Sequence, residues 1–222
     1  MEMKKIIYIS LFCLSFCSDI YEYKIKSFGI HVAKCSMSIK DTMFNNNNNI
    51  LLNFTVNTLN IFDVLYPINN KYTIIIDNNS IGTNYFKKHT IQPKIINSIE
   101  TTIKDDIIYY IDSGYFIPEN TLNIFSLLYF LMMDPIQIHY NQNNILEREG
   151  KFYSYSIFKD NEKYELDIFP LDDDVGLIKY TDIFTWAIFK DGVKRYIYID
   201  DNKIQKCVVK SGILNFTAEY IE

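Results

Sequence analysis

Apolar and polar residues alternate with a period of two along most of the chain, and this pattern constrains the fold more than any other feature. The alternation is clear in the pairs Tyr21 and Tyr23, and Leu52 and Phe54. A β-strand presents successive side chains to opposite faces, so the pattern predicts half-buried strands. The 18 tyrosines and 16 phenylalanines favour the same structure, because aromatic residues suit a pleated surface. Strands are predicted over residues 20–39, 50–59, 65–77, 80–89, 95–102, 107–111, 136–140, 152–158, 164–169, 176–181, 184–189, 195–199, 205–210 and 213–220.

The spacing of turn residues predicts a single mainly β domain over residues 18–222. Asp191-Gly192 and Asp201-Asn202 are the clearest hairpin turns, since these residue types tolerate positive φ. The chain holds only 7 glycines and 5 prolines, and no linker rich in Pro, Gly or Ser divides it. All-β domains of this length commonly fold as one unit.

The first 17 residues have the pattern of a secretory signal peptide. Lys4 and Lys5 precede the apolar run 6–16, which is too short to span a bilayer as a helix. Cleavage before Ser18 would place the chain in the periplasm or at the outer membrane. A lipid anchor on Cys17 is the alternative, but Phe16 occupies a position where a lipobox has a small residue. No later segment could span a membrane as a helix.

One ten-residue apolar segment, residues 124–133, predicts a helix within the β pattern. Asn123 is placed as its N-cap, and Asp134-Pro135 ends it. Ser126 is its only polar residue, so the helix must be covered on all sides. Burial between a curved sheet and a loop is the simpler explanation.

The functional alternative is that a lipid or other apolar ligand covers one flank of this helix. Concave, mostly apolar sites are what such ligands select. The candidate ligand-binding residues are Phe125, Leu128, Tyr129 and Met132.

No residue pattern indicates catalysis, a metal site or a cofactor. The serines lack a nucleophile-elbow motif, and no histidine or cysteine has a partner at metal-ligand spacing. Glu147 and Glu149 are close in sequence, but nothing fixes their separation in space. We therefore expect a non-catalytic protein. Cys35 and Cys207 are the thiols of the mature chain, and they could form a disulfide or be buried separately.

The charge distribution argues against a nucleic-acid partner. The formal net charge is −5, and the lysines and arginines are spread along the chain without basic runs. Nucleic-acid binders normally show a basic patch or stripe.

The order of motifs resembles the bacterial domain of unknown function 3108 family, whose members are exported envelope proteins. The stretch 123–131 is similar to the family's Asp-x-x-Ser-x-x-Tyr-x-x-Arg helix, although Asn123 replaces the acidic residue and a methionine stands where an arginine is usual. Further matching stretches are residues 23–25, 28–33, 65–68, 77, 85–88 and 198–204.

The resemblance implies a curved, incompletely closed antiparallel half-barrel with a helix against its concave face. This outline is similar to periplasmic carriers of lipoproteins, which hold acyl chains. Two functions follow as expectations. The first is a carrier that shelters a lipid-like ligand under the helix. The second is a structural or protein-interaction module of the envelope, whose interior is filled by its own side chains and whose sheet edge docks an envelope protein.

Overall fold

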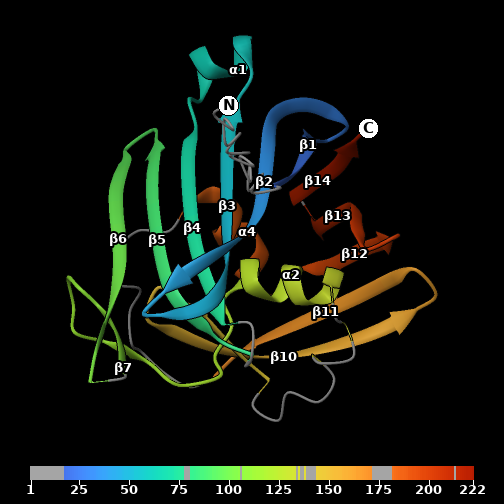
Figure 1. Cartoon of the computed structure of the whole chain (residues 1–222). Helices are drawn as coiled ribbons and strands as arrows, with labels where there is room; N and C mark the ends of the chain where they lie inside the picture. The colour runs from blue at the N-terminus through green and yellow to red at the C-terminus, as the bar shows by residue number, and fades with distance from the viewer. Residues whose placement is uncertain are drawn as a thin grey trace, which may run out of the picture.

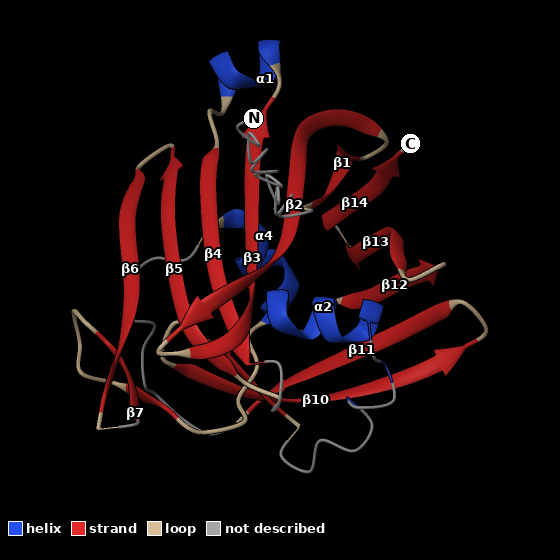
Figure 2. Ribbon diagram, in the orientation of Figure 1, coloured by secondary structure: helices blue, strands red, loops and turns tan. Residues whose placement is uncertain are grey.

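The computed structural model describes residues 18–77, 81–105, 107–133, 135, 138, 144–171, 182–212 and 214–222. Within these ranges one antiparallel sheet runs in the order β8-β7-β6-β5-β4-β3-β2-β1-β14-β13-β12-β11-β10-β9 (Figures 1 and 2). Its strands are β1 (Asp19–Ser27), β2 (Ile30–Phe44), β3 (Asn47–Thr58), β4 (Asn69–Asp77), β5 (Thr83–Gln92), β6 (Ile95–Lys104), β7 (Ile107–Tyr110), β8 (Phe116–Ile117), β9 (Ile145–Arg148), β10 (Lys151–Asp160), β11 (Lys163–Pro170), β12 (Lys194–Asp200), β13 (Lys203–Ser211) and β14 (Leu214–Ile221).

The sheet curves almost into a barrel and leaves one seam between β8 and β9, which confirms the incompletely closed antiparallel architecture. Leu122, in the segment that precedes the central helix, bridges the seam. Its N–H donates to the carbonyl of Ile145 at 3.2 Å, and its carbonyl accepts from the N–H of Glu147 at 2.7 Å. The backbone of β9 is therefore paired on both sides, although β8 and β9 do not pair with each other.

The helix α2 (Ile124–Met133) lies inside the curved sheet, as predicted (Figure 2). Asn123 is its N-cap: the side-chain Oδ1 accepts from the N–H of Ser126 at 2.9 Å. The Ser126 hydroxyl in turn accepts from the N–H of Asn123 at 2.9 Å. This reciprocal pair satisfies two helix-end donors, so the one polar residue of the helix also has a structural role.

The segment 184–189 was predicted as a strand, and this is wrong: it belongs to helix α4 (Ile183–Phe189). Its isoleucine and aromatic residues suit a strand by propensity. The segment buries Thr185, Ala187 and Phe189 against the barrel interior, however, while Trp186 is exposed. A buried backbone must pair its polar groups, and a helix does so internally. Asp182 caps this helix, with Oδ1 accepting from the N–H groups of Phe184 and Thr185 at 3.0 Å each.

Other boundaries differ from the prediction for local reasons. The run 20–39 is two strands, because Phe28 and Gly29 take positive φ and form a tight hairpin turn. Leu65 ends the short helix α1 (Asn60–Leu65) and does not begin a strand. Asp191-Gly192 connects α4 to β12 and is no hairpin turn, whereas Asp201-Asn202 does join β12 to β13.

Several expectations fall outside the described residues. These are the leader, Cys17, the strand 176–181 and most of the strand 136–140, in which the described Ile138 is helical. The described ranges contain no helix with the length and hydrophobicity that a membrane-spanning helix needs.

Candidate functional site

An apolar cavity of about 150 Å³ lies in the barrel between α2, α4 and the sheet. Strands from both halves of the chain contribute to its wall, so the cavity forms only when the sheet closes. Most of its lining is aromatic or aliphatic. The lining residues are Tyr23, Ile25, Cys35, Met37, Phe54, Val56, Tyr72, Phe125, Leu128, Phe184, Thr185, Ile188, Ile204, Cys207 and Ala218.

The position of α2 is set by an aromatic cluster on the β3–β4 side of the cavity. The ring centroid of Phe125 lies 4.8 Å from that of Phe54 and 4.5 Å from that of Tyr72. Tilted aromatic pairs at such distances are favourable beyond the area that they bury. Phe125 therefore fixes α2 against the sheet and at the same time forms part of the cavity wall.

Two of the four predicted ligand-binding residues line this cavity, and two do not. Phe125 and Leu128 are in the wall. Tyr129 is half-buried and packs edge-to-face against Phe130, with ring centroids 5.4 Å apart. Met132 is fully buried in the core but is not part of the lining. The prediction missed the contribution of α4, because it assigned a strand to that segment.

Both cysteines of the β domain line the cavity as free thiols. Burial raises the pKa of each thiol to about 12. Cys35 is on β2 and Cys207 is on β13, and β1 and β14 lie between these strands in the sheet. Neighbouring strands are about 4.8 Å apart, so the three steps from β2 to β13 span roughly 14 Å along the sheet, which is more than the Cα separation of a disulfide allows. The disulfide considered from sequence is therefore not formed in the structure.

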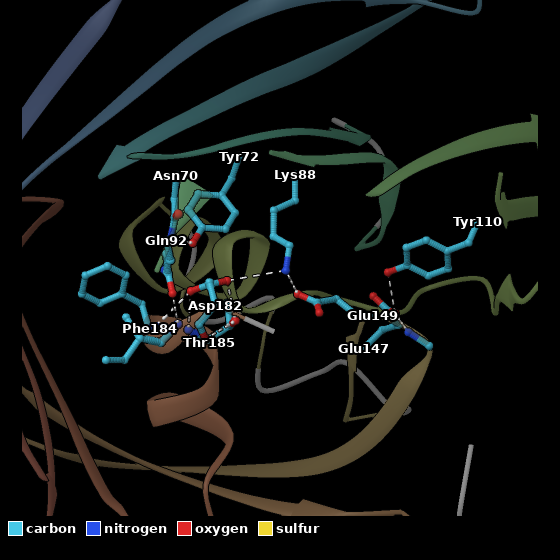
Figure 3. Close-up of polar contacts among 12 residues, drawn as sticks. Asn70, Tyr72, Lys88, Gln92, Tyr110, Glu147, Glu149, Asp182, Phe184 and Thr185 are labelled. Carbon is cyan, nitrogen blue, oxygen red and sulfur yellow. Dashed lines mark hydrogen bonds and ion pairs between the residues drawn. The ribbon is translucent and has the colours of Figure 1, made fainter. Parts of the chain in front are cut away.

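A buried ion cluster lies beside the cavity, and Lys88 of β5 is its centre (Figure 3). The Lys88 ammonium is fully buried between two carboxylates. It donates to Glu149 Oε1, and Asp182 Oδ2 lies 3.7 Å away. Asp182 also holds the hydroxyl of Thr185, which donates to Oδ2 at 2.7 Å. The cluster thus ties β5, the β9–β10 turn and the start of α4 together.

Glu149 reaches this interior position because the β9–β10 turn points inward. Glu149 and Gly150 both have positive φ, 52° and 92°, as a two-residue type I′ hairpin turn requires. Both residues are buried. Burial raises the pKa of the Glu149 carboxyl, and the neighbouring Lys88 charge opposes this shift. Sequence alone gives no sign of this arrangement, since a Glu-Gly turn is normally at the surface.

A second buried carboxyl, Glu147, lies at the seam of the barrel. Its Oε1 accepts from the Tyr110 hydroxyl of β7 and from the N–H of Gly150, each at 2.6 Å. Burial raises the pKa of this carboxyl to about 7, because the hydrogen bonds only partly offset the loss of solvation. The side chain therefore links both edges of the sheet and stays largely protonated in mildly acidic solution.

The raised pKa of Glu147 predicts a pH-dependent stability. The folded chain binds one more proton than the unfolded chain between pH 4.5 and about 7, so this group destabilises the fold progressively as pH rises through that window. Glu147→Gln keeps the acceptor and removes the titration. Its free energy of unfolding should match that of the wild type at pH 4.5 and exceed it by about 3 kcal/mol at pH 8.

Urea denaturation at the two pH values measures this difference. Glu162→Gln, in an exposed turn, controls for the loss of one negative charge. If the difference in the free energy of unfolding between Glu147→Gln and the wild type does not grow with pH, the Glu147 carboxyl does not have the raised pKa described above.

The described residues contain no group of three or more His, Cys, Asp or Glu side chains placed to hold a metal ion. The ion cluster is accordingly a pairing of one cation with carboxylates, and the chemistry available at the cavity itself is apolar contact.

The similarity of this chain to known proteins is structural. No protein-family model and no curated protein matches the chain. Among solved structures, the chain is similar to a β-barrel-like protein of domain of unknown function DUF1849 from Brucella abortus. The two have 10% sequence identity and a TM-score of 0.46, and the match covers 92% of this chain and 95% of the other.

Proposed function

We propose that the chain is a non-catalytic binding protein of the bacterial cell envelope, which holds a small apolar ligand between α2 and α4. The observation that carries this proposal is the cavity of about 150 Å³ with its apolar wall. The proposed export rests on the signal-like leader, and the resemblance to the 3108 family rests on the motifs quoted above.

The space between α2 and α4 is unusual for a protein interior. Protein interiors are packed as densely as organic crystals, and apolar space that stays unfilled is unfavourable. A ligand that fills this space would make contacts that its apolar wall otherwise lacks.

The size of the cavity limits the ligand. In another protein, an engineered apolar cavity of about 150 Å³ stays dry and binds benzene or xenon. The cavity described here therefore suits a benzene-sized molecule or the end of an acyl chain, and a whole lipid chain would require the helices to move apart. Phe125 and Leu128 of α2 and Phe184 and Ile188 of α4 would contact the ligand from two sides.

Docking of a protein by strand addition has less support. β8 is two residues long, and the bridge from Leu122 covers β9. The two terminal strands of the sheet are therefore short or covered, which does not favour strand addition at them.

A cavity-filling substitution tests the binding proposal. Ala218 of β14 faces the cavity, and Ala218→Leu would occupy about half of the volume. We expect benzene to raise the melting temperature of the wild type in a saturable way and to have at least tenfold weaker affinity for the variant. Thr217→Leu is the matched control, because the next residue of a strand points to the opposite face.

Native and denaturing mass spectra of protein purified from a bacterial envelope provide the second readout. An apolar molecule that is bound in the native spectrum and lost on denaturation would identify the ligand class. If neither benzene nor a co-purifying molecule binds, or if Ala218→Leu and Thr217→Leu bind benzene as the wild type does, the cavity is not a binding site.

A further inference from the structure

Aliphatic and aromatic side chains are exposed at one end of the sheet, on the tips of three alternate connections. Phe28 and Ile30 are at the β1–β2 turn, Ile61, Val64 and Leu65 are on α1, and Ile96 follows the β5–β6 turn. We call these six residues the apolar rim. Val64, Leu65 and Ile61 are 85%, 74% and 69% exposed.

In an antiparallel meander every second connection lies at the same end of the sheet, so these three connections share one end. Strand adjacency also makes them neighbours. The N–H of Leu59, just before α1, donates to the carbonyl of Val32 near the start of β2 at 3.1 Å. Asn69, at the start of β4, pairs with Ile91 near the end of β5. Figure 1 shows α1 projecting beyond the ends of β3 and β4, with the β5–β6 turn at the same end.

The folding of α1 itself does not explain why its apolar side chains are exposed. The helix has only six residues, and its N-cap residue makes no side-chain hydrogen bond. Of its apolar residues, Phe62 alone is partly covered. Short helices are marginal unless tertiary packing holds an apolar face, yet this one directs three aliphatic side chains to solvent. Ile61, Val64 and Leu65 are spaced i, i+3 and i+4, so they share one face of α1, and exposed apolar surface of this kind marks an interaction site.

Among the described residues at this end, three exposed lysines outnumber two aspartates, although the whole chain carries −5. Lys94 is in the β5–β6 turn, and Lys194 and Lys210 are directly paired at the ends of β12 and β13. All three are exposed. Asp63 and Asp191 lie among the tips at this end. Lysines beside exposed aliphatic residues are the combination that binds an anionic lipid surface.

We propose that the apolar rim inserts into the surface of an anionic lipid bilayer. Its aliphatic residues stand on separate projecting tips, which can enter a fluid interface independently. Protein-binding hot spots instead gather aromatic and arginine residues at a well-packed centre. The proposal does not depend on the cavity. The cavity and the apolar rim are nevertheless toward the same end of the sheet, because α4 lies toward that end. There Phe184 contacts Phe216, and the N–H of Ile183 donates to Gln92 Oε1.

Vesicle flotation of the full chain tests the inference, with bilayers of phosphatidylethanolamine and phosphatidylglycerol. The triple variant Ile61→Ser, Val64→Ser, Leu65→Ser should reduce binding at least tenfold. The control triple variant Ile20→Ser, Met43→Ser, Phe158→Ser changes three other apolar residues, which are 60% to 64% exposed, at the opposite end and should bind as the wild type does. The leader is identical in all three proteins, so it cannot produce a difference between them.

A site-specific probe gives the second readout. Val64→Trp should show a blue-shifted emission and quenching by brominated lipid, and Met43→Trp should show neither. Raising the salt concentration should weaken binding to the anionic vesicles. Equal binding by the two triple variants, or a Val64→Trp emission unaffected by brominated lipid, would overturn the proposal and leave a protein partner for the rim. Neither result depends on whether the cavity binds a ligand.

Discussion

Lys88→Met should lower the free energy of unfolding by about 3 to 5 kcal/mol at neutral pH. The substitution keeps the length of the side chain and removes the only cation that contacts Glu149 and Asp182 among the described residues. Two carboxylates would then be buried without a counter-charge. Folded domains of this size are stable by about 5 to 15 kcal/mol, so the loss would be a large fraction of the total. Urea denaturation followed by circular dichroism measures it.

The neighbouring lysine provides the control for this prediction. Lys87 also pairs with a glutamate, Glu100 at 2.8 Å, but both side chains are at the surface. An exposed ion pair contributes about 0 to 1 kcal/mol, so Lys87→Met should have little effect. The double variant Lys88→Met, Glu149→Leu should recover part of the loss, because it also removes one of the unpaired charges. Equal effects of Lys88→Met and Lys87→Met would mean that the buried cluster does not hold the fold.

Leu127→Ala is the second large expected effect, a loss of about 2 to 5 kcal/mol in the free energy of unfolding. Leu127 is on α2 and is fully buried in the core. Its truncation would leave a second void beside the α2 N-cap. Thermal unfolding measures the change. Met133→Ala, at the exposed end of the same helix, is the matched control and should cost less than 1 kcal/mol. A small effect of Leu127→Ala would show that α2 is loosely packed on the sheet.

The strands and α2 could be predicted because their signals are local. Period-2 alternation marks a half-buried strand, and Asn123 with Ser126 marks the start of α2. The assignment of Phe125 and Leu128 to the cavity wall could be made from the prediction of α2 alone, because a helix that is apolar on all sides must present some residues to any cavity beside it.

The helix α4 and the ion cluster could not be predicted, because they depend on tertiary context. The residues of α4 have strand propensity, and only enclosure by the sheet favours the helix. Lys88 and Glu149 are 61 residues apart, and a single sequence does not indicate that they meet. Glu147 and Glu149 resemble a surface turn, yet closure of the barrel buries both. Tyr129 and Met132 were assigned to the ligand site for lack of information about which face of α2 meets the cavity.

A crystal structure under xenon pressure tests whether the space between α2 and α4 accepts apolar atoms. We predict strong anomalous density in the cavity, within van der Waals distance of Phe125, Phe184 and Ile188. A structure in which these side chains fill the cavity and xenon is absent from it would contradict the binding proposal.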